Sequence, residues 1–293
     1  MAPKTVEELV KRIDQIPTLP MVSSQIMRLL EDENVSINKL SELIEKDQAL
    51  AVKILKVANS SFYGSFSQTS SIDYAIMKLG LGEVKAILHA FSIHSFFSQK
   101  SPAGFDRAQF WKHAIICSQI ARYLGTYFNM GKDDTLFLSG LIHDLGKIIF
   151  DQYFHDDFLQ IIQLVNDHHE SFSKAEKTVL GFTHYQVAAK LLQKWQFPKK
   201  IIMQVFYHHA PWNDANFSAG SIVIYLANIL TKLAGYPCLE SERPPDLNEF
   251  ADSNAMAHIV KSGFDLDRAS LETLVNNIRE FISGESENML RFF

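Results

Sequence analysis

Thr135-Leu-Phe-Leu-Ser-Gly-Leu-Ile-His-Asp144, followed at once by Leu145-Gly-Lys147, is the run that decides how this sequence is interpreted. Its apolar residues predict a buried helix that ends in a histidine and an aspartate. A buried carboxylate must be paired, hydrogen-bonded or bound to a metal. Imidazole nitrogen and carboxylate oxygen together suit a divalent cation. The plainer alternative is a capped helix end, with Gly146 stopping the helix and Lys147 near its negative end.

Other histidines lie at helical positions on both sides of this run. A helix predicted over about residues 107–127 carries His113 on its apolar face, so this imidazole points inward. Thr183 is a good N-terminal cap for a helix that begins near His184. The polar cluster at 167–170, in contrast, is expected to be solvated. Eleven histidines are more than a chain of this size usually carries, so their placement matters.

Two further helices are predicted, one with Pro198 in its first turn and one over Ile222 to Leu233, which Ser218 opens. In the first, His208 lies one step round from the inward face, which helical spacing assigns to Ile202, Val205, Phe206 and His209. The helices therefore bring five imidazoles and one carboxylate toward a common interior: His113, His143, Asp144, His184, His208 and His209. Such a set is enough for one or two transition-metal ions, for which we consider iron, zinc, nickel and manganese.

The first hundred residues read as short helices separated by polar turns. No run of strict alternation predicts a strand. We therefore predict an all-α protein, whose first half has helices over about 5–13, 21–31, 36–44, 49–58, 71–79 and 82–97. The helices on either side of Gly80 are compatible with a DNA-reading pair. The residues after Gly80 are weakly basic, which favours a structural hairpin instead.

Composition limits the class of protein. With 47% hydrophobic and 21% charged residues, the chain is typical of a soluble globular protein. A net charge of −5 and a pI of about 6.1 argue against a general nucleic-acid binder, and the apolar stretches are too short to span a membrane. Cys117 and Cys238 form no CxxC pair and indicate reduced thiols in a cytoplasm. The first residues lack the pattern of a signal peptide.

Four segments of the first half resemble the HDOD family in their residues, order and spacing: Ile16-Pro-Thr-Leu-Pro20, Ile44-Glu-Lys-Asp47, Ala51-Val-Lys-Ile-Leu-Lys-Val-Ala-Asn-Ser60 and Ile72-Asp-Tyr-Ala-Ile-Met-Lys-Leu-Gly80. The resemblance covers about residues 11–215. It departs from the family at Gln48, where members usually have a proline. HDOD domains are a regulatory offshoot of the HD-domain phosphohydrolases, so the resemblance implies a bacterial signalling role.

The resemblance also implies an architecture. We expect an N-terminal helical subdomain over residues 1–105, packed on an HD-domain-like helical bundle over residues 106–235. A C-terminal helical extension follows over residues 236–293, and its residues 240–246 read as a charged, proline-containing linker. We expect no catalytic chemistry in this extension.

HD phosphohydrolases bind their metal through an H…HD…D pattern. This chain resembles that pattern at His113 and at His143-Asp144, but Asn228 stands where the last aspartate is expected. An amide oxygen binds a divalent metal more weakly than a carboxylate does, because it contributes no net charge. The implied site is therefore less charged than that of an active enzyme and suits zinc, iron or nickel better than magnesium.

The two-metal HD-GYP branch adds a histidine that opens a later helix and a His-His pair, and His184 and His208-His209 resemble these elements. That branch also has a glutamate one turn before its first histidine, where this chain has Gln109. No Gly-Tyr-Pro follows the His-His pair, so the loop that recognises cyclic-di-GMP is missing. Gly235-Tyr-Pro237 lies too far along the chain to replace it.

We therefore expect a non-catalytic regulatory module that binds a signalling protein partner, with a metal or a small phosphorylated ligand at a degenerate HD site. No receiver or cyclase domain is expected in the chain, so a separate partner would supply the signal. The alternative is a metal-dependent phosphohydrolase that acts on a nucleotide or a cyclic dinucleotide. In that alternative Lys147 is the catalytic residue that faces a phosphate oxygen. DNA binding through the hairpin at Gly80 is a weaker third hypothesis.

Overall fold

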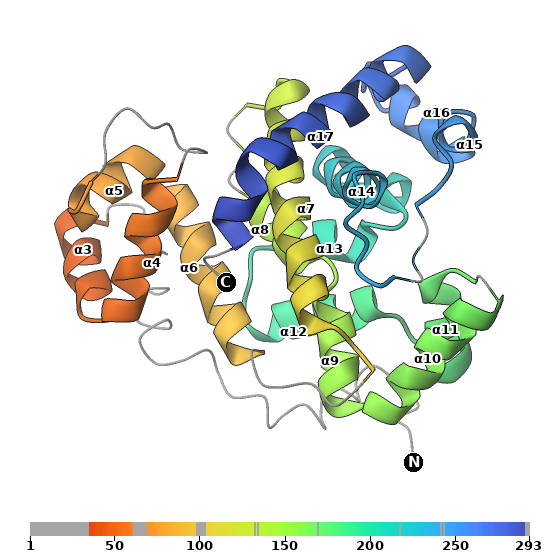
Figure 1. Cartoon of the computed structure of the whole chain (residues 1–293), viewed down its shortest axis with the longest axis horizontal. Coiled ribbons are helices and arrows are strands. Elements are labelled where there is room, and N and C mark those ends of the chain that lie inside the picture. The colour runs from red at the N-terminus through yellow and green to blue at the C-terminus, as the bar shows by residue number, and fades with distance from the viewer. Residues whose placement is uncertain are drawn as a thin grey trace. The chain divides into compact units, whose positions relative to one another are not determined.

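Apolar residues at helical spacing dominate this chain, and the computed structural model contains helices and no strand in the residues that it describes (Figure 1). These residues are 35–60, 69–97, 104–131, 133, 135–168, 170–216, 218–240, 242 and 244–290. The all-α prediction is confirmed. The helices predicted over 5–13 and 21–31 lie outside the described residues.

The chain divides into two compact units, one built around residues 17–99 and the other around residues 100–280. In the first unit the described helices are α3 Ile37–Glu45, α4 Gln48–Ala58, α5 Ile72–Leu79 and α6 Leu81–Phe96. The Asp47 side chain accepts the backbone N–H of Leu50 at 3.1 Å and caps α4, and Ser71 caps α5 in the same way. Gly80, with φ of 84°, ends α5 and leads directly into α6, so it lies between two helices as predicted.

Apolar side chains of these four helices form a common core. The side chains with no exposure in this core come from α3, α4, α5 and α6: Leu40, Ile44, Ile54, Ala58, Ala75, Ile76 and Val84. Packing of this core, rather than the propensity of the short helices themselves, stabilises the unit.

The second unit contains the six residues of the predicted metal site. Its helices are α7 Arg107–Tyr127, α8 Thr135–Ile142, α9 Leu145–Tyr153, α10 His155–His168, α11 Phe172–Val179, α12 His184–Lys194, α13 Lys199–Tyr207, the short 3-10 helix η3 Pro211–Asn213, α14 Ser218–Leu233, α15 Leu247–Ala251, α16 Asn254–Lys261 and α17 Arg268–Leu290. The long helix α7 packs against α8 and α14, while α12 packs against α9 and α13 (Figure 1). This packing gathers helix ends that lie far apart in sequence around one interior.

The inward face of α13 differs from the prediction. Ile201, Gln204 and Val205 are buried, whereas Ile202 and Phe206 are half-buried and line a groove against α12. A hydrogen bond explains the difference, because the Ser139 hydroxyl donates to Gln204 Oε1 at 2.5 Å and holds this amide inside. The inward face of α13 is therefore rotated about the helix axis relative to the predicted one. As a result, His208 is fully buried and His209 lies at the edge of the interior.

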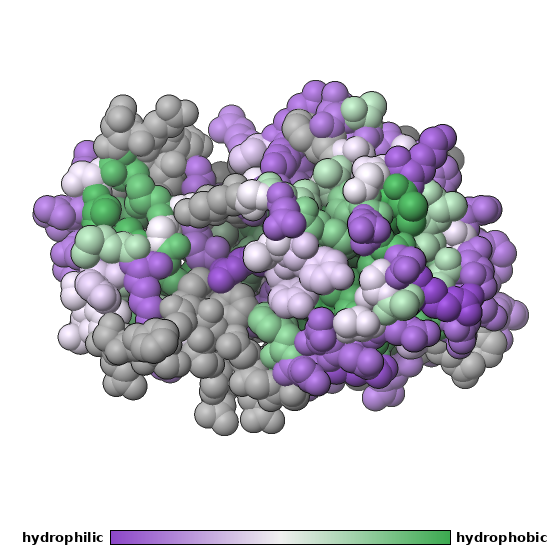
Figure 2. All heavy atoms as spheres, turned by 90° about the horizontal axis from the view of Figure 1, so that it is seen from above, coloured by the Kyte–Doolittle hydropathy of each residue, from purple (hydrophilic) through white to green (hydrophobic). Residues whose placement is uncertain are grey.

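The surface of the described residues is mixed in polarity. Figure 2 shows hydrophilic side chains over much of one face, with hydrophobic ones between them. The exposed large hydrophobic residues are scattered over several helices: Val52, Tyr74, Met77, Tyr127, Trp212 and Val260. None of the described helices combines the length and the apolar character that a membrane span requires.

A pair of neighbouring residues on α5 tests the packing of the first unit. Ile76 has no exposed surface, whereas Met77 is 59% exposed. Replacing Ile76 by alanine should lower the free energy of unfolding by about 2–5 kcal/mol, because it leaves a cavity in the core. Met77→Ala should change it by less than about 0.5 kcal/mol. Urea unfolding of both variants measures the difference, and equal losses would contradict the described core.

Candidate metal centre

His113 and His143 face each other across two packed helices. His113 lies on the buried face of α7, and His143 follows the last residue of α8. Neither has exposed surface, and their Nε2 atoms are 3.4 Å apart. His113 Nδ1 lies 2.7 Å from the carbonyl oxygen of Tyr236, and His143 Nδ1 lies 2.7 Å from that of Gly140. Because a carbonyl only accepts, each Nδ1 carries hydrogen and each Nε2 faces the partner ring.

Gly146 positions the next histidine rather than stopping a helix. It lies in the first turn of α9, so the helix-stop interpretation is wrong. A Cβ atom built on Gly146 would lie 2.0 Å from the carbonyl oxygen of His184 and 2.6 Å from its Cα. The absence of a side chain therefore lets the backbone of α9 touch the start of α12.

His184 is oriented by a carboxylate from α11. Glu176 accepts the backbone N–H of His184 at 3.0 Å and lies 2.8 Å from its Nδ1. Thr183 N–H donates to Gln186 Oε1 at 2.9 Å, which closes the first turn of α12 as the predicted cap position suggests. Sequence reasoning missed Glu176. The available signal was its place among buried positions of an amphipathic helix, where a carboxylate needs a partner.

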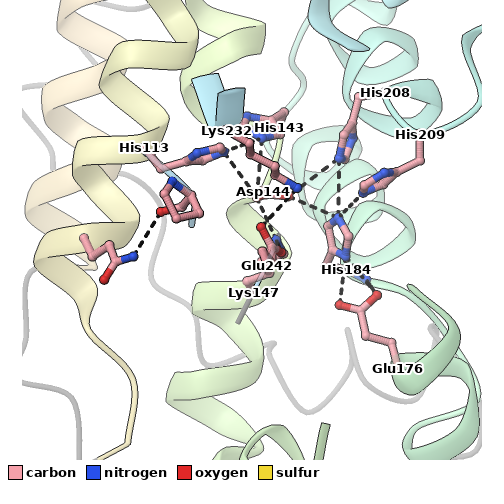
Figure 3. Close-up of polar contacts among 12 residues, drawn as sticks. His113, His143, Asp144, Lys147, Glu176, His184, His208, His209, Lys232 and Glu242 are labelled. Atoms are coloured by element: carbon pink, nitrogen blue, oxygen red, sulfur yellow. Dashed lines mark hydrogen bonds and ion pairs between the residues drawn. The ribbon is translucent and has the colours of Figure 1, made fainter. Parts of the chain in front are cut away.

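The His-His pair after α13 completes the cluster. His208 has no exposed surface, and its Nδ1 lies 2.6 Å from the carbonyl oxygen of Val205. Its Nε2 lies 3.4 Å from His184 Nε2, and His209 Nε2 lies 3.1 Å from that same atom. The structure therefore brings all five predicted imidazoles to one place. Figure 3 shows His113 and His143 on one side of Asp144 and His184, His208 and His209 on the other.

These residues fit a divalent metal ion. They form two possible ligand groups that share Asp144, one with His113 and His143 and the other with His184, His208 and His209. Asp144 Oδ1 is buried and has no hydrogen-bond donor among the described residues, although His184 Nε2 lies 3.2 Å away. The lone pairs of the imidazole nitrogens and of the unsatisfied Asp144 oxygen repel one another unless a cation lies between these atoms. A divalent ion held there would supply Lewis acidity toward a phosphoryl oxygen or a water molecule.

Lys147 neutralises the other side of Asp144. Its side chain is buried, with Nζ 2.9 Å from Asp144 Oδ2, 2.6 Å from Glu242 Oε1 and 4.6 Å from the centre of the Phe172 ring. Glu242 Oε2 lies 3.0 Å from Lys232 Nζ. Two lysines and two carboxylates thus alternate beside the histidines (Figure 3). Sequence reasoning missed Glu242, because a charged segment with prolines is typical of a solvated linker.

The charges shift several pKa values. Burial disfavours a charged His143, but the Asp144 carboxylate outweighs burial and raises the pKa of His143 to about 10. Burial opposes the ionised form of Asp144 as well, yet Lys147 and His143 hold its pKa well below the usual range. Burial lowers the pKa of His113 and of His208 to about 3. Near pH 7 these two rings are therefore neutral, as metal binding requires.

The two amide positions are not arranged as ligands. Gln109 Nε2 donates to the carbonyl oxygen of Pro237 at 3.2 Å. Gln109 and His113 help to line a cavity of about 390 Å³ at the surface, together with Lys112 and residues 235–237. Asn228 is buried on α14, and its Oδ1 has no hydrogen-bond partner among the described residues.

Comparison with known proteins identifies the family. The HDOD domain profile matches residues 16–211, close to the range of the resemblance in the sequence. The chain belongs to the HDOD family. The fold of this HDOD chain is similar to that of an HDOD domain protein from Geobacter sulfurreducens, with a TM-score of 0.78, 23% identity and coverage of 95% of this chain and 96% of that one.

A Shewanella amazonensis protein, whose name marks it as a candidate phosphohydrolase, has a similar fold, with a TM-score of 0.76, 20% identity and 97% coverage of both chains. A protein from Treponema pallidum is 24% identical over 215 residues, which are 70% of this chain and 40% of the relative. The HDOD chain therefore spans less than half the length of the curated relatives that it matches.

The contact between Gly146 and His184 predicts a sensitive backbone position. Gly146→Ala forces the starts of α9 and α12 apart, so we expect a loss of about 2–4 kcal/mol of unfolding free energy. Gln193→Ala, at an exposed position of α12, is the control and should stay within about 0.5 kcal/mol. Chemical unfolding followed by circular dichroism measures both. A Gly146→Ala variant as stable as the control would contradict the close approach.

The buried ion pairs predict a pH dependence. Burial raises the pKa of Glu242, but Lys147 and Lys232 outweigh it and lower the pKa from 4.5 to about 2. The ionised carboxylate therefore stabilises the fold fully above pH 4.5, and this contribution is lost as pH falls through about 2. Glu242→Gln should cost about 3 kcal/mol at pH 7 and little at pH 2.

The measurement is urea unfolding of both proteins between pH 2 and pH 7. Glu272→Gln, at an exposed position of α17, is the matched control and should follow the wild type at every pH. A difference between wild type and Glu242→Gln that stays constant over this pH range would refute the assigned pairing.

Proposed function

We propose that this HDOD chain is a regulatory module of bacterial signal transduction that binds a protein partner. We further propose that its HD-type site holds a metal ion without hydrolysing a phosphorylated substrate. HDOD membership supports the regulatory part, because the resemblance in the sequence implies such a role. The free cysteines Cys117 and Cys238 are both buried, which agrees with a reducing cytoplasm as the place of action.

The pairing of Lys147 is the observation that carries the non-catalytic part. In a hydrolase this ammonium would be free to face a phosphate oxygen. Here its side chain is buried, and Nζ contacts Asp144 at 2.9 Å and Glu242 at 2.6 Å. An incoming phosphate would have to displace Glu242 and expose the lysines that neutralise it. Displacing a buried ion pair costs several kcal/mol.

The amide positions support the same proposal. Gln109 is hydrogen-bonded to the backbone at Pro237, and Asn228 contributes no carboxylate. A hydrolytic site uses anionic ligands to hold metal ions that activate water and clamp a phosphoryl group. With the carboxylates absent from both positions, Asp144 is the one aspartate in either ligand group of the described residues.

Phosphohydrolase activity is the second candidate function. Two ligand groups that share Asp144 favour it, since neighbouring metal ions are a common arrangement in phosphate-cleaving sites. The similarity to a candidate phosphohydrolase of Shewanella amazonensis points the same way at the level of fold. In this alternative a nucleotide or cyclic dinucleotide would approach through the cavity lined by Gln109 and His113.

A substrate panel separates the two functions. Nucleoside mono-, di- and triphosphates, cyclic dinucleotides and p-nitrophenyl phosphate are incubated with the protein and added manganese, iron or nickel. We expect phosphate release equal to that without protein, because Lys147 is already neutralised. Asp144→Asn is the control for traces of a contaminating enzyme. Turnover by the wild type that disappears in Asp144→Asn would establish the hydrolase instead.

The partner requires a separate experiment. Complexes are cross-linked and isolated from the native bacterium, and the captured protein is then purified and titrated with the chain by calorimetry. We expect a defined stoichiometry and saturable binding. If none of the purified candidate partners binds the chain, the proposal that the chain is a partner-binding regulatory module is contradicted.

A further inference from the structure

Four distances between ligand atoms of the second ligand group lie close to those of four-coordinate geometry. In a tetrahedral zinc site with bonds of about 2.0–2.1 Å, neighbouring ligand atoms lie about 3.3–3.4 Å apart. From His184 Nε2, the distances are 3.4 Å to His208 Nε2, 3.1 Å to His209 Nε2 and 3.2 Å to Asp144 Oδ1. His208 Nε2 lies 3.6 Å from Asp144 Oδ1. Octahedral neighbours would lie closer, at about 2.9 Å, for the same bonds.

The ligands of this group are also held in place. The Glu176 carboxylate contacts both the backbone N–H and the Nδ1 of His184. The Val205 carbonyl oxygen lies 2.6 Å from His208 Nδ1. A carboxylate behind a metal-binding imidazole fixes its ring and raises its basicity. Asp144 Oδ1, the oxygen that faces this group, has no hydrogen-bond donor among the described residues. His209 is half-buried, so its side of the group gives an ion a route from solvent.

The first ligand group has fewer ligands, and its carboxylate oxygen is shared with a lysine. It has three members. His143 Nε2 lies 3.4 Å from His113 Nε2 and 3.4 Å from Asp144 Oδ2, but His113 Nε2 lies 3.9 Å from Asp144 Oδ2. That oxygen already contacts the Lys147 ammonium at 2.9 Å, so its lone pairs are shared with a cation. By the resemblance to HD domains, Asn228 stands where the last aspartate is expected, so no further carboxylate is expected for this group. A second metal ion here would face a nearby positive charge and an incomplete ligand set.

We propose that the site holds a single four-coordinate ion, of the zinc class, bound by Asp144, His184, His208 and His209. Four protein ligands leave no open position for water or substrate, which is the pattern of structural rather than catalytic zinc. This inference rests on the proposed function in one respect, the presence of a metal, and goes beyond it by fixing the number, coordination and role of the ion.

Metal content is the first test. The protein is purified without chelator or nickel resin, loaded with zinc and dialysed, and its metal is measured by elemental analysis. We expect one zinc ion per chain in the wild type and in His113→Ala. We expect at least about 100-fold weaker zinc binding in His209→Ala, and 10–100-fold weaker binding in Glu176→Gln. Two ions per chain, no ion, or equal losses in His113→Ala and His209→Ala would overturn the inference.

Cobalt substitution of the wild type gives a readout that depends on no variant. Four-coordinate Co²⁺ absorbs strongly in the visible range, whereas six-coordinate Co²⁺ absorbs weakly. We expect the strong bands, and a fall of at least about 5 °C in the unfolding temperature when a chelator removes the ion. Weak bands, or an unfolding temperature that the chelator leaves unchanged, would exclude a structural four-coordinate ion.

The two proposals fail in different ways. Two ions per chain without turnover on the substrate panel would overturn the single-ion inference and leave the regulatory proposal standing. One four-coordinate ion together with turnover that Asp144→Asn abolishes would overturn the regulatory proposal and the structural role of the ion, and would leave its number and coordination standing.

Discussion

A carboxylate shielded from water, Asp144, lies where α8 and α9 meet, and the surrounding structure is arranged to compensate its charge. Lys147 contacts one oxygen, and three imidazoles of the second ligand group converge on the other. Lys147 in turn needs Glu242, and Glu242 needs Lys232. Each buried charge therefore requires the next, because an uncompensated ion in this interior would cost more than most single contacts contribute. The fold of the second unit brings these groups together from α8, α9, α12, α14 and the segment before α15.

Much of this arrangement could be predicted from the sequence, because it depends on helical periodicity and local caps. The limits of α7 and the cap at Thr183 follow from spacing alone, whereas the convergence of five histidines is predicted from spacing together with the resemblance to HD domains. Long-range pairings do not. Gln204 turns inward because a serine on another helix donates to it, and Glu242 is buried because Lys147 and Lys232 are. These partners lie too far away in sequence for a local pattern to predict the pairings.

The role of Gly146 shows a different limit. In sequence, a glycine after a polar pair reads as the end of a helix. Only the close approach of α12 in the structure shows the reason for this glycine. A side chain at this position would collide with the backbone of His184. The contrast also bears on function. The histidines are the residues that resemble an enzyme, but the groups around them decide what they do. In the proposed function, the paired lysines and the amide at Asn228 make the same imidazoles a place that holds an ion and does not cleave a phosphate.

The position of Glu242 has a consequence for where this domain ends. The family match stops at residue 211, beyond the last histidine of the cluster, and a boundary drawn there would seem complete by inspection of motifs. The carbonyl of Tyr236, the ammonium of Lys232 and the carboxylate of Glu242 all come later in the chain. A protein shortened to the matched range would keep every imidazole of the cluster. It would lack the Glu242 carboxylate that covers Lys147 and the Tyr236 carbonyl that orients His113.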